Sequence, residues 1–106
     1  MAQVEFAPAA LQDLKDIKEH LKSKNCGSNF ENKTLSKILS ATERLETFPD
    51  LGPSLDSITK FASPYRYLAL GDYIVVYKRE GNKCIIVLVS STKQDWIKSL
   101  IHFQKA

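Results

Sequence analysis

Positively charged side chains within one stretch, residues 65–96, are the residues of this chain best suited to chemistry. The stretch reads YRYLALGDYIVVYKREGNKCIIVLVSSTKQDW, and its candidate cations are Arg66, Lys78, Arg79 and Lys93. Guanidinium and ammonium groups stabilise the negative charge that develops on a phosphate during its transfer. Alternatively, an arginine at the start of a strand pairs with a nearby carboxylate, and for Arg66 this could be Asp72 or Asp95.

Aromatic side chains accompany these cations. Tyr65, Tyr67 and Trp96 could stack on nucleic-acid bases, a contact that contributes about 1–3 kcal/mol per base. The other interpretation is structural, because tyrosines in a strand commonly pack against neighbours and keep a solvated hydroxyl. Both interpretations stay open at this point.

The distribution of charge also indicates a charged partner. Residues 1–53 carry seven basic and eight acidic side chains, whereas residues 54–106 carry eight and four. An excess of positive charge attracts polyanions through counterion release, and it equally suits an acidic protein surface.

Metal, membrane and secretion signals are missing from the sequence. Cys26 and Cys84 are isolated and lack the spacing of metal ligands, so we expect free thiols and neither a metal nor a cofactor. No run approaches the roughly 18 apolar residues that a membrane span requires, and the opening MAQVEF does not resemble a secretory signal. We expect one domain, residues 1–106, located in the cytoplasm and without a membrane partner.

The elements that would position the cations are three antiparallel strands joined by tight turns. Gly71-Asp72 and Gly81-Asn82 mark the turns, because glycine adopts positive φ at little steric cost. Strict alternation places Arg66 with Leu68 and Leu70 on one face of the first of these strands. In the last strand, the same alternation places two sets of residues on opposite faces: Cys84, Ile86, Leu88 and Ser90 on one, and Ile85, Val87, Val89 and Ser91 on the other. Because both faces of the last strand are apolar, we expect it to be central in the sheet.

A short strand and two helices precede these strands. Residues 3–6 alternate as in a strand, and Pro8 is suited to the start of a helix that ends at residues 25–27. The apolar stripe of this helix is Leu11, Leu14, Ile17 and Leu21, with Asp13 among the residues of the opposite face. Ser28 and Glu31 have capping-box spacing, and the second stripe is Leu35, Ile38, Leu39, Leu45 and Phe48. Two amphipathic helices joined by so short a turn form an antiparallel hairpin.

The remaining segments complete the predicted topology. Residues 49–64 form a crossing segment rich in proline, glycine and serine, and residues 95–103 have the pattern of a short terminal helix in which Asp95 caps the start. The predicted fold is α+β, in the order β-α-α-β-β-β-α, with an antiparallel sheet packed against the helical hairpin.

Four local patterns in this order resemble the RelE/ParE toxins of bacterial type II toxin–antitoxin systems. They are F-x-P-x-A-x-x-D-L-x-x-I from Phe6 to Ile17, L-x-x-F-P-x-x-G from Leu45 to Gly52, Y-R-Y-L-x-x-G-x-Y-x-V-x-Y from Tyr65 to Tyr77, and a polar turn from Lys93 to Trp96. The resemblance spans nearly the whole chain. It implies a small growth-arresting toxin that a cognate antitoxin neutralises by wrapping an initially unfolded segment around it.

The resemblance also implies two alternative activities. RelE-like members cut messenger RNA in the ribosomal decoding site, and ParE-like members poison DNA gyrase and lack the nuclease residues. Arg66 matches the arginine that RelE-like members direct at the phosphate, Lys93 matches a basic residue after the last strand, and Lys60 lies in a loop that carries catalytic lysines in that branch. Cutting RNA also requires an acid and a base.

The acid–base pair is difficult to find in this chain. His20 lies within the first helix and His102 near the end of the last, and surface positions suit both. Where many members have Gly-Arg-Arg-Asp after the last strand, this chain has Thr92-Lys93-Gln94-Asp95, with one cation instead of two. We therefore rank gyrase poisoning slightly above ribosome-dependent RNA cleavage, with a non-enzymatic antitoxin-binding module as the third hypothesis.

Overall fold

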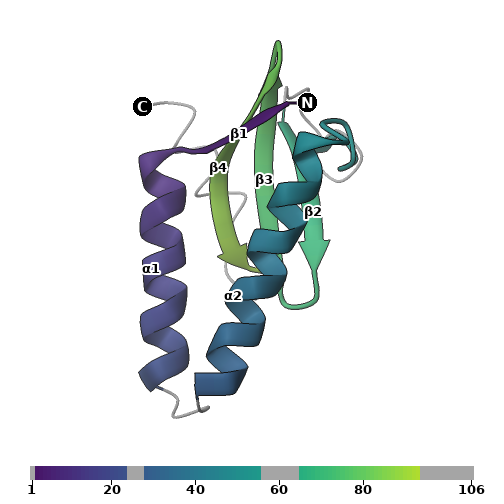
Figure 1. Ribbon diagram of the computed structural model, residues 1–106. Coiled ribbons are helices and arrows are strands. Elements are labelled where there is room, and N and C mark those ends of the chain that lie inside the picture. The colour runs from purple at the N-terminus through teal and green to yellow at the C-terminus, as the bar shows by residue number, and fades with distance from the viewer. Residues whose placement is uncertain (1, 24–27, 56–64, 94–106) are drawn as a thin grey trace.

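Two helices cover one face of a four-stranded sheet in the structure, a computed structural model (Figure 1). It describes residues 2–23, 28–55 and 65–93. The elements in chain order are β1 (Gln3–Phe6), α1 (Pro8–Ser23), α2 (Ser28–Glu43), the 3₁₀ turn η1 (Arg44–Glu46), β2 (Tyr65–Leu70), β3 (Tyr73–Glu80) and β4 (Lys83–Ser91). The predicted terminal helix, Cys26 and most of the crossing segment lie outside the described residues. No helix among those described is long and apolar enough to cross a membrane.

Helix α1 begins at Pro8, as its sequence predicts. The first α-helical hydrogen bond runs from the Leu11 N–H to the Ala7 carbonyl oxygen. The helix therefore needs no hydrogen bond from the N–H group that Pro8 lacks. The buried stripe begins one residue earlier than predicted, at the fully buried Ala10, and continues through Ile17 and Leu21. Leu11 is 49% exposed, because one helical step of about 100° turns it away from the sheet.

Helix α2 returns antiparallel to α1, which confirms the predicted hairpin (Figure 1). Ile38 and Leu45 of the predicted stripe are buried, but Leu39 and Phe48 are exposed. The prediction of one helix of about five turns was wrong at its end. The helix tightens into η1 after Glu43, and the chain then leaves the helix axis, so Phe48 no longer follows the buried stripe.

The sheet has the strand order β1-β4-β3-β2. Strands β2, β3 and β4 are antiparallel neighbours, and Gly71 and Gly81 take φ values of 64° and 57° at the turns. The predicted all-antiparallel sheet was wrong for β1, which pairs parallel with β4. The helical hairpin explains this direction. It returns the chain to the end of the sheet where β1 begins, and there the Ala2 N–H donates to the Glu46 carbonyl oxygen at 2.8 Å.

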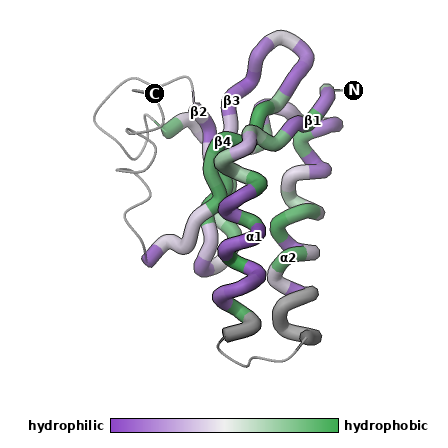
Figure 2. The backbone as a smooth tube through the Cα atoms, turned by 90° about the vertical axis from the view of Figure 1, so that its left-hand side faces the viewer, coloured by the Kyte–Doolittle hydropathy of each residue, from purple (hydrophilic) through white to green (hydrophobic). Residues whose placement is uncertain are grey.

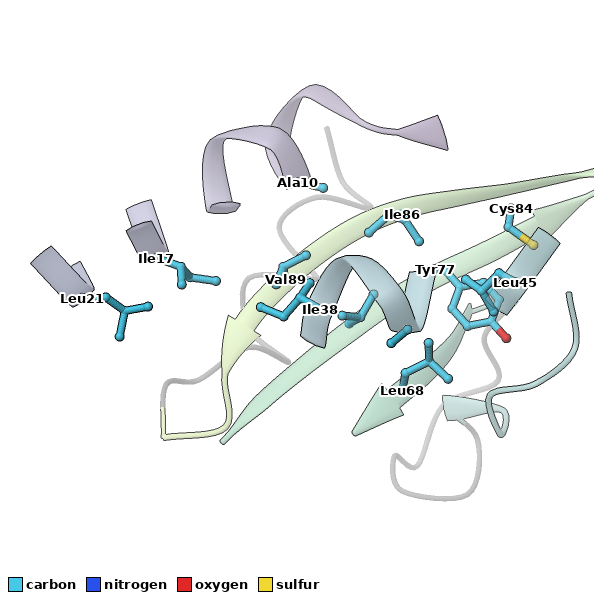
Figure 3. Close-up of a cluster of buried hydrophobic side chains, with 12 residues drawn as sticks. Ala10, Ile17, Leu21, Ile38, Leu45, Leu68, Tyr77, Cys84, Ile86 and Val89 are labelled. Atoms are coloured by element: carbon cyan, nitrogen blue, oxygen red, sulfur yellow. The ribbon is translucent and has the colours of Figure 1, made fainter. Parts of the chain in front are cut away.

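Strand β4 is central, as predicted, and is largely buried on both faces. Toward the helices, buried residues of α1, α2, η1, β2, β3 and β4 form the main core (Figure 3), and Val4 and Phe6 of β1 pack against it. The opposite face carries a second cluster that includes Leu55, Ile74 and Val76. In Figure 2 the hydrophobic part of β4 lies beside α1, and the tip of the β3–β4 hairpin is hydrophilic.

A β-bulge changes the predicted facing of β4. Val76 pairs with Leu88 while Tyr77 pairs with Ile86, so Val87 is the extra residue. Val89 therefore joins the core beneath the helices, and Leu88 joins Val87 on the opposite face. Strict alternation placed Leu88 and Val89 on the reverse faces, because it does not allow for a bulge.

Asp13 completes the edge of β4 beyond the end of β1. Ala7 makes the last β1-side hydrogen bond, to the Ile86 carbonyl oxygen, and the Val89 N–H then donates to Asp13 Oδ2 at 3.0 Å. Asp13 is half-buried and does not belong to an exposed helix face as predicted. Burial raises the pKa of its carboxyl group, the Val89 bond opposes this rise, and Asp16 adds to it.

Candidate functional site

Arg66 anchors the segment that follows η1 to the start of β2. Its Nη1 donates to the Gly52 carbonyl oxygen at 2.8 Å, and its Nε lies 3.6 Å from Asp50 Oδ1. The arginine stands opposite Tyr77 on the helix-facing side of the sheet, and its side chain is 35% exposed. The guanidinium group is thus occupied on one side and open to solvent on the other.

Arg79 holds the same aspartate from β3. Its Nη1 lies 2.7 Å from Asp50 Oδ2, and its Nε donates to the Gly81 carbonyl oxygen at 3.2 Å. One carboxylate therefore bridges two guanidinium groups, which leaves an excess of positive charge at this end of the sheet. Asp50 was not among the predicted partners of Arg66, which were Asp72 and Asp95. Asp72 instead accepts hydrogen bonds from Thr92 through its carbonyl oxygen, and Asp95 lies outside the described residues.

Gly52 fits between β2 and the Tyr77 ring. Its N–H donates to Tyr77 Oη at 2.9 Å, and a Cβ placed here would overlap the Tyr67 carbonyl oxygen. Tyr77 is completely buried beside Leu45 and Cys84 (Figure 3), and burial raises the pKa of its hydroxyl group. Close backbone approach thus explains the glycine of the L-x-x-F-P-x-x-G pattern.

A tight turn, Phe48–Leu51, joins η1 to Gly52. The Leu51 N–H donates to the Phe48 carbonyl oxygen at 3.0 Å, and Pro49 takes the second position, where its fixed φ favours such a turn. Phe48 is 60% exposed and Leu51 is 45% exposed. This arrangement differs from the prediction, in which Phe48 belongs to the buried stripe of the second helix. The only available signal was the Phe-Pro-Asp order, which is typical of a turn.

The other predicted contact residues lie elsewhere. Lys78 is on the sheet face away from the helices and pairs with Glu80 at 2.9 Å, an interaction that raises the lysine pKa. Tyr65 is buried in the cluster on that face, and Tyr67 packs against it. This burial favours the structural interpretation of both tyrosines. Lys60, Trp96 and His102 lie outside the described residues, and His20 is exposed on α1.

Lys93 is separated from Arg66 by the length of the sheet. Arg66 stands opposite Tyr77, whereas Lys93 follows Ser91, which stands opposite Tyr73. The four residues of β3 between these two positions alone span roughly 13 Å at about 3.3 Å per residue. The structure therefore brings Arg66 and Arg79 together but does not place Arg66 and Lys93 around one phosphate. Among the residues described, no cluster of His, Cys, Asp and Glu could hold a metal ion.

Comparison with known proteins assigns the class. Among solved structures, a chain of the "Chromosomal ParDE TA system from P. aeruginosa" superposes with a TM-score of 0.70 over 86% of this chain and 96% of that chain. At 18% identity this similarity shows a shared fold. No curated protein matches the chain by sequence.

Family membership follows from the sequence match. Residues 4–96 match the family described as the ParE toxin of type II toxin-antitoxin system, parDE. Because the match covers most of the chain, the chain belongs to the ParE toxin family of type II toxin–antitoxin systems. The predicted resemblance to RelE/ParE toxins is thus confirmed for its ParE branch.

Proposed function

We propose that this protein is the toxin of a ParDE-type pair, that it acts in the cytoplasm by poisoning DNA gyrase, and that a cognate antitoxin neutralises it. The observation that carries the proposal is the family match over residues 4–96. Gyrase poisoning is the activity that the resemblance to ParE-like toxins implies. The similar fold of a chain from a ParDE system supports an antitoxin partner.

The geometry of the cations agrees with a toxin that binds its target and does not cut RNA. Arg66 is bound to Gly52 and Asp50, and Lys93 lies at the far end of the sheet. The hydroxyl of Tyr77 is close to this site but completely buried, with a raised pKa, so it is not available for proton transfer to a substrate. These features disfavour the general acid–base chemistry that RNA cleavage requires.

A protein that acts by binding alone must discriminate between states of its target. A ligand shifts a conformational equilibrium only by the difference in its affinity for the two states. To poison gyrase, the toxin must therefore bind the DNA-cleaved state more tightly than the resealed state. This difference is the quantity to measure.

The test is to express the chain alone in a bacterium and to score growth, chromosomal DNA breaks and transcript ends in the same cultures. Purified gyrase with supercoiled plasmid and the purified chain gives the corresponding measurement in vitro. We expect growth arrest with gyrase-dependent DNA breaks. Cleaved transcripts with intact DNA would instead support the ribosome-dependent nuclease, and harmless expression would support the antitoxin-binding module.

A further inference from the structure

The Phe48–Leu51 turn presents two large apolar side chains to water at its two ends. A solvent-exposed leucine alone is ordinary, but a phenylalanine and a leucine on one tight turn form a compact apolar projection. Burial of the exposed part of each side chain against a partner would be favourable, and this contribution is missing while the turn stays exposed. A surface of this kind is typical of an anchor for a partner.

The turn is held in place from several directions. The Phe48 N–H donates to the Arg44 carbonyl oxygen at 2.9 Å, and the Leu51 N–H closes the turn itself. Asp50, at the third position of the turn, is bound by Arg79 and Arg66. Gly52, the first residue after the turn, is bound by Tyr77 and Arg66. Because the turn is already ordered, it loses little conformational entropy when it binds.

Charge around the turn indicates what its partner carries. The guanidinium groups of two arginines, Arg66 and Arg79, contact Asp50 of the turn, and Arg66 also contacts the adjoining Gly52, against the single carboxylate of Asp50. Among the described residues, Arg66 donates a hydrogen bond from Nη1 and Arg79 donates from Nε and Nη1, and a guanidinium group has five N–H donors in all. The positive charge beside the turn is therefore that of Arg66 and Arg79, which Asp50 neutralises only in part.

We propose that the Phe48–Leu51 turn is the target-binding surface of this toxin, and that it inserts Phe48 and Leu51 into an apolar pocket with an acidic rim on the folded target. This inference rests on the proposed function, which makes that target DNA gyrase. A rigid convex turn fits a preformed concave pocket on a folded protein. An antitoxin segment that folds on binding instead covers long apolar grooves.

The test compares two variants on purified gyrase. The double variant Phe48→Ser with Leu51→Ser removes both anchors, and Leu11→Ser is the matched control because Leu11 is similarly exposed but lies at the start of α1 (Figure 1). We expect the double variant to lose about 30-fold or more in the concentration needed for gyrase-dependent DNA cleavage, because a central anchor contributes at least about 2 kcal/mol. Leu11→Ser should behave as the wild type. Equal potency of the double variant and the wild type would overturn the inference.

A cross-linking measurement avoids dependence on the fold of the double variant. A photoreactive phenylalanine analogue at position 48 should cross-link to purified gyrase, and the same analogue at position 11 should not. Higher ionic strength should slow association, as expected for an acidic rim facing arginines. Cross-linking from position 11 but not from position 48 would place the target on another surface and overturn the inference.

Growth assays separate failure of this inference from failure of the proposed function. If the wild type arrests growth without acting on gyrase, the proposed target is wrong. The inference then stands if the double variant loses toxicity and Leu11→Ser keeps it, and it falls if both variants remain toxic. If the wild type affects neither growth nor gyrase, the turn has no target and both proposals are overturned.

Discussion

Arg66 illustrates how a residue selected for its chemistry can have a structural role. The sequence singles it out as a cation in an aromatic strand, and the structure shows it bound to Gly52 and Asp50. Its partner could not be predicted, because Asp50 lies 16 positions earlier in a segment with no regular pattern. The contact depends on how the crossing segment folds back onto β2, which is a tertiary property.

Replacement of Arg66 by alanine should therefore lower stability more than it changes any chemical step. We expect Arg66→Ala to reduce the free energy of unfolding by about 1 kcal/mol, mainly through the bond to the Gly52 carbonyl. The Asp50 pair at 3.6 Å is exposed and adds little. Urea denaturation measures the change, with the exposed Arg44→Ala as the control. Loss of toxicity by orders of magnitude at unchanged stability would instead restore a catalytic role for Arg66.

Asp13 should make stability depend on pH. Burial raises its folded-state pKa above the ordinary value of 3.8, so the folded protein binds this proton more tightly than the unfolded chain. Stability should therefore decline as the pH rises from that value through the folded pKa, and remain lower above it. Asp13→Asn keeps an acceptor for the Val89 N–H and removes the charge, so near neutral pH it should be as stable as the wild type or more stable.

Thermal unfolding across a range of pH measures the difference in stability between Asp13→Asn and the wild type. This difference should shrink as the pH falls and the wild-type carboxyl group becomes protonated. Glu19→Gln, which removes an exposed carboxylate from the same helix, controls for general charge effects. Asp13→Ala should lower stability by about 1–3 kcal/mol, because the Val89 N–H then lacks an acceptor. A stability advantage of Asp13→Asn that grows toward low pH would contradict the expected direction of the pH dependence.

At the scale of elements, the segment from Phe48 to Leu55 is attached to the sheet at several points. Gly52 meets Tyr67 and Tyr77, the Pro53 carbonyl oxygen accepts from the Tyr67 N–H at 3.1 Å, and Leu55 is fully buried. The sequence placed this segment in a loop but did not predict its docking. The attachments at Gly52 and Pro53 involve backbone groups, and a backbone carbonyl is the same in every residue type.

Gly52→Ala tests this attachment directly. An added methyl group would overlap the Tyr67 carbonyl oxygen, and the backbone cannot move away without separating the segment from β2. We expect a loss of about 1–3 kcal/mol or more in the free energy of unfolding, as for other overpacked sites. Chemical denaturation provides the value, and the exposed Thr47→Ala should stay within about 0.5 kcal/mol of the wild type. Equal effects of the two substitutions would show that Gly52 is not closely packed.

Strand β4 shows why a sequence pattern can predict the position of a strand in the sheet but not the face on which each of its residues lies. Its continuous apolar run correctly predicted a central strand covered on both faces. The bulge at Val87 then reversed the facing of the residues that follow. Valine, leucine and isoleucine suit either face of this strand, so their order contains no signal for the extra residue.

At the scale of the whole molecule, the stability of different regions should follow their position in the sheet. Strands β3 and β4 supply half of the buried residues of the two core clusters, whereas β1 is a four-residue edge strand. Native-state hydrogen exchange should therefore give the slowest rates for amides of residues 75–77 and 86–89 and faster rates for β1. Amides of α1 or α2 that outlast those of β4 would contradict this order.

The overall architecture was predictable to the extent that it depends on local patterns. The helical hairpin, the three-stranded meander and the α+β class follow from periodicity and turn residues. The partner and direction of β1 do not follow from them. Four alternating residues specify a strand, but its neighbour is determined by the return of the helices and by the space left beside β4.

The pairing of the first strand with the last has a consequence for biosynthesis. Gln3 stands beside Lys83, 80 positions later, and Arg79 and Tyr77, which hold the Phe48–Leu51 turn, are also late in the chain. At synthesis rates of about 5–20 residues per second, β1 is made roughly 4–16 s before its neighbour. The sheet of a nascent polypeptide thus stays incomplete until residues 83–86 have been made, and a ribosome that stops before residue 77 releases a fragment that we expect to be harmless to its host.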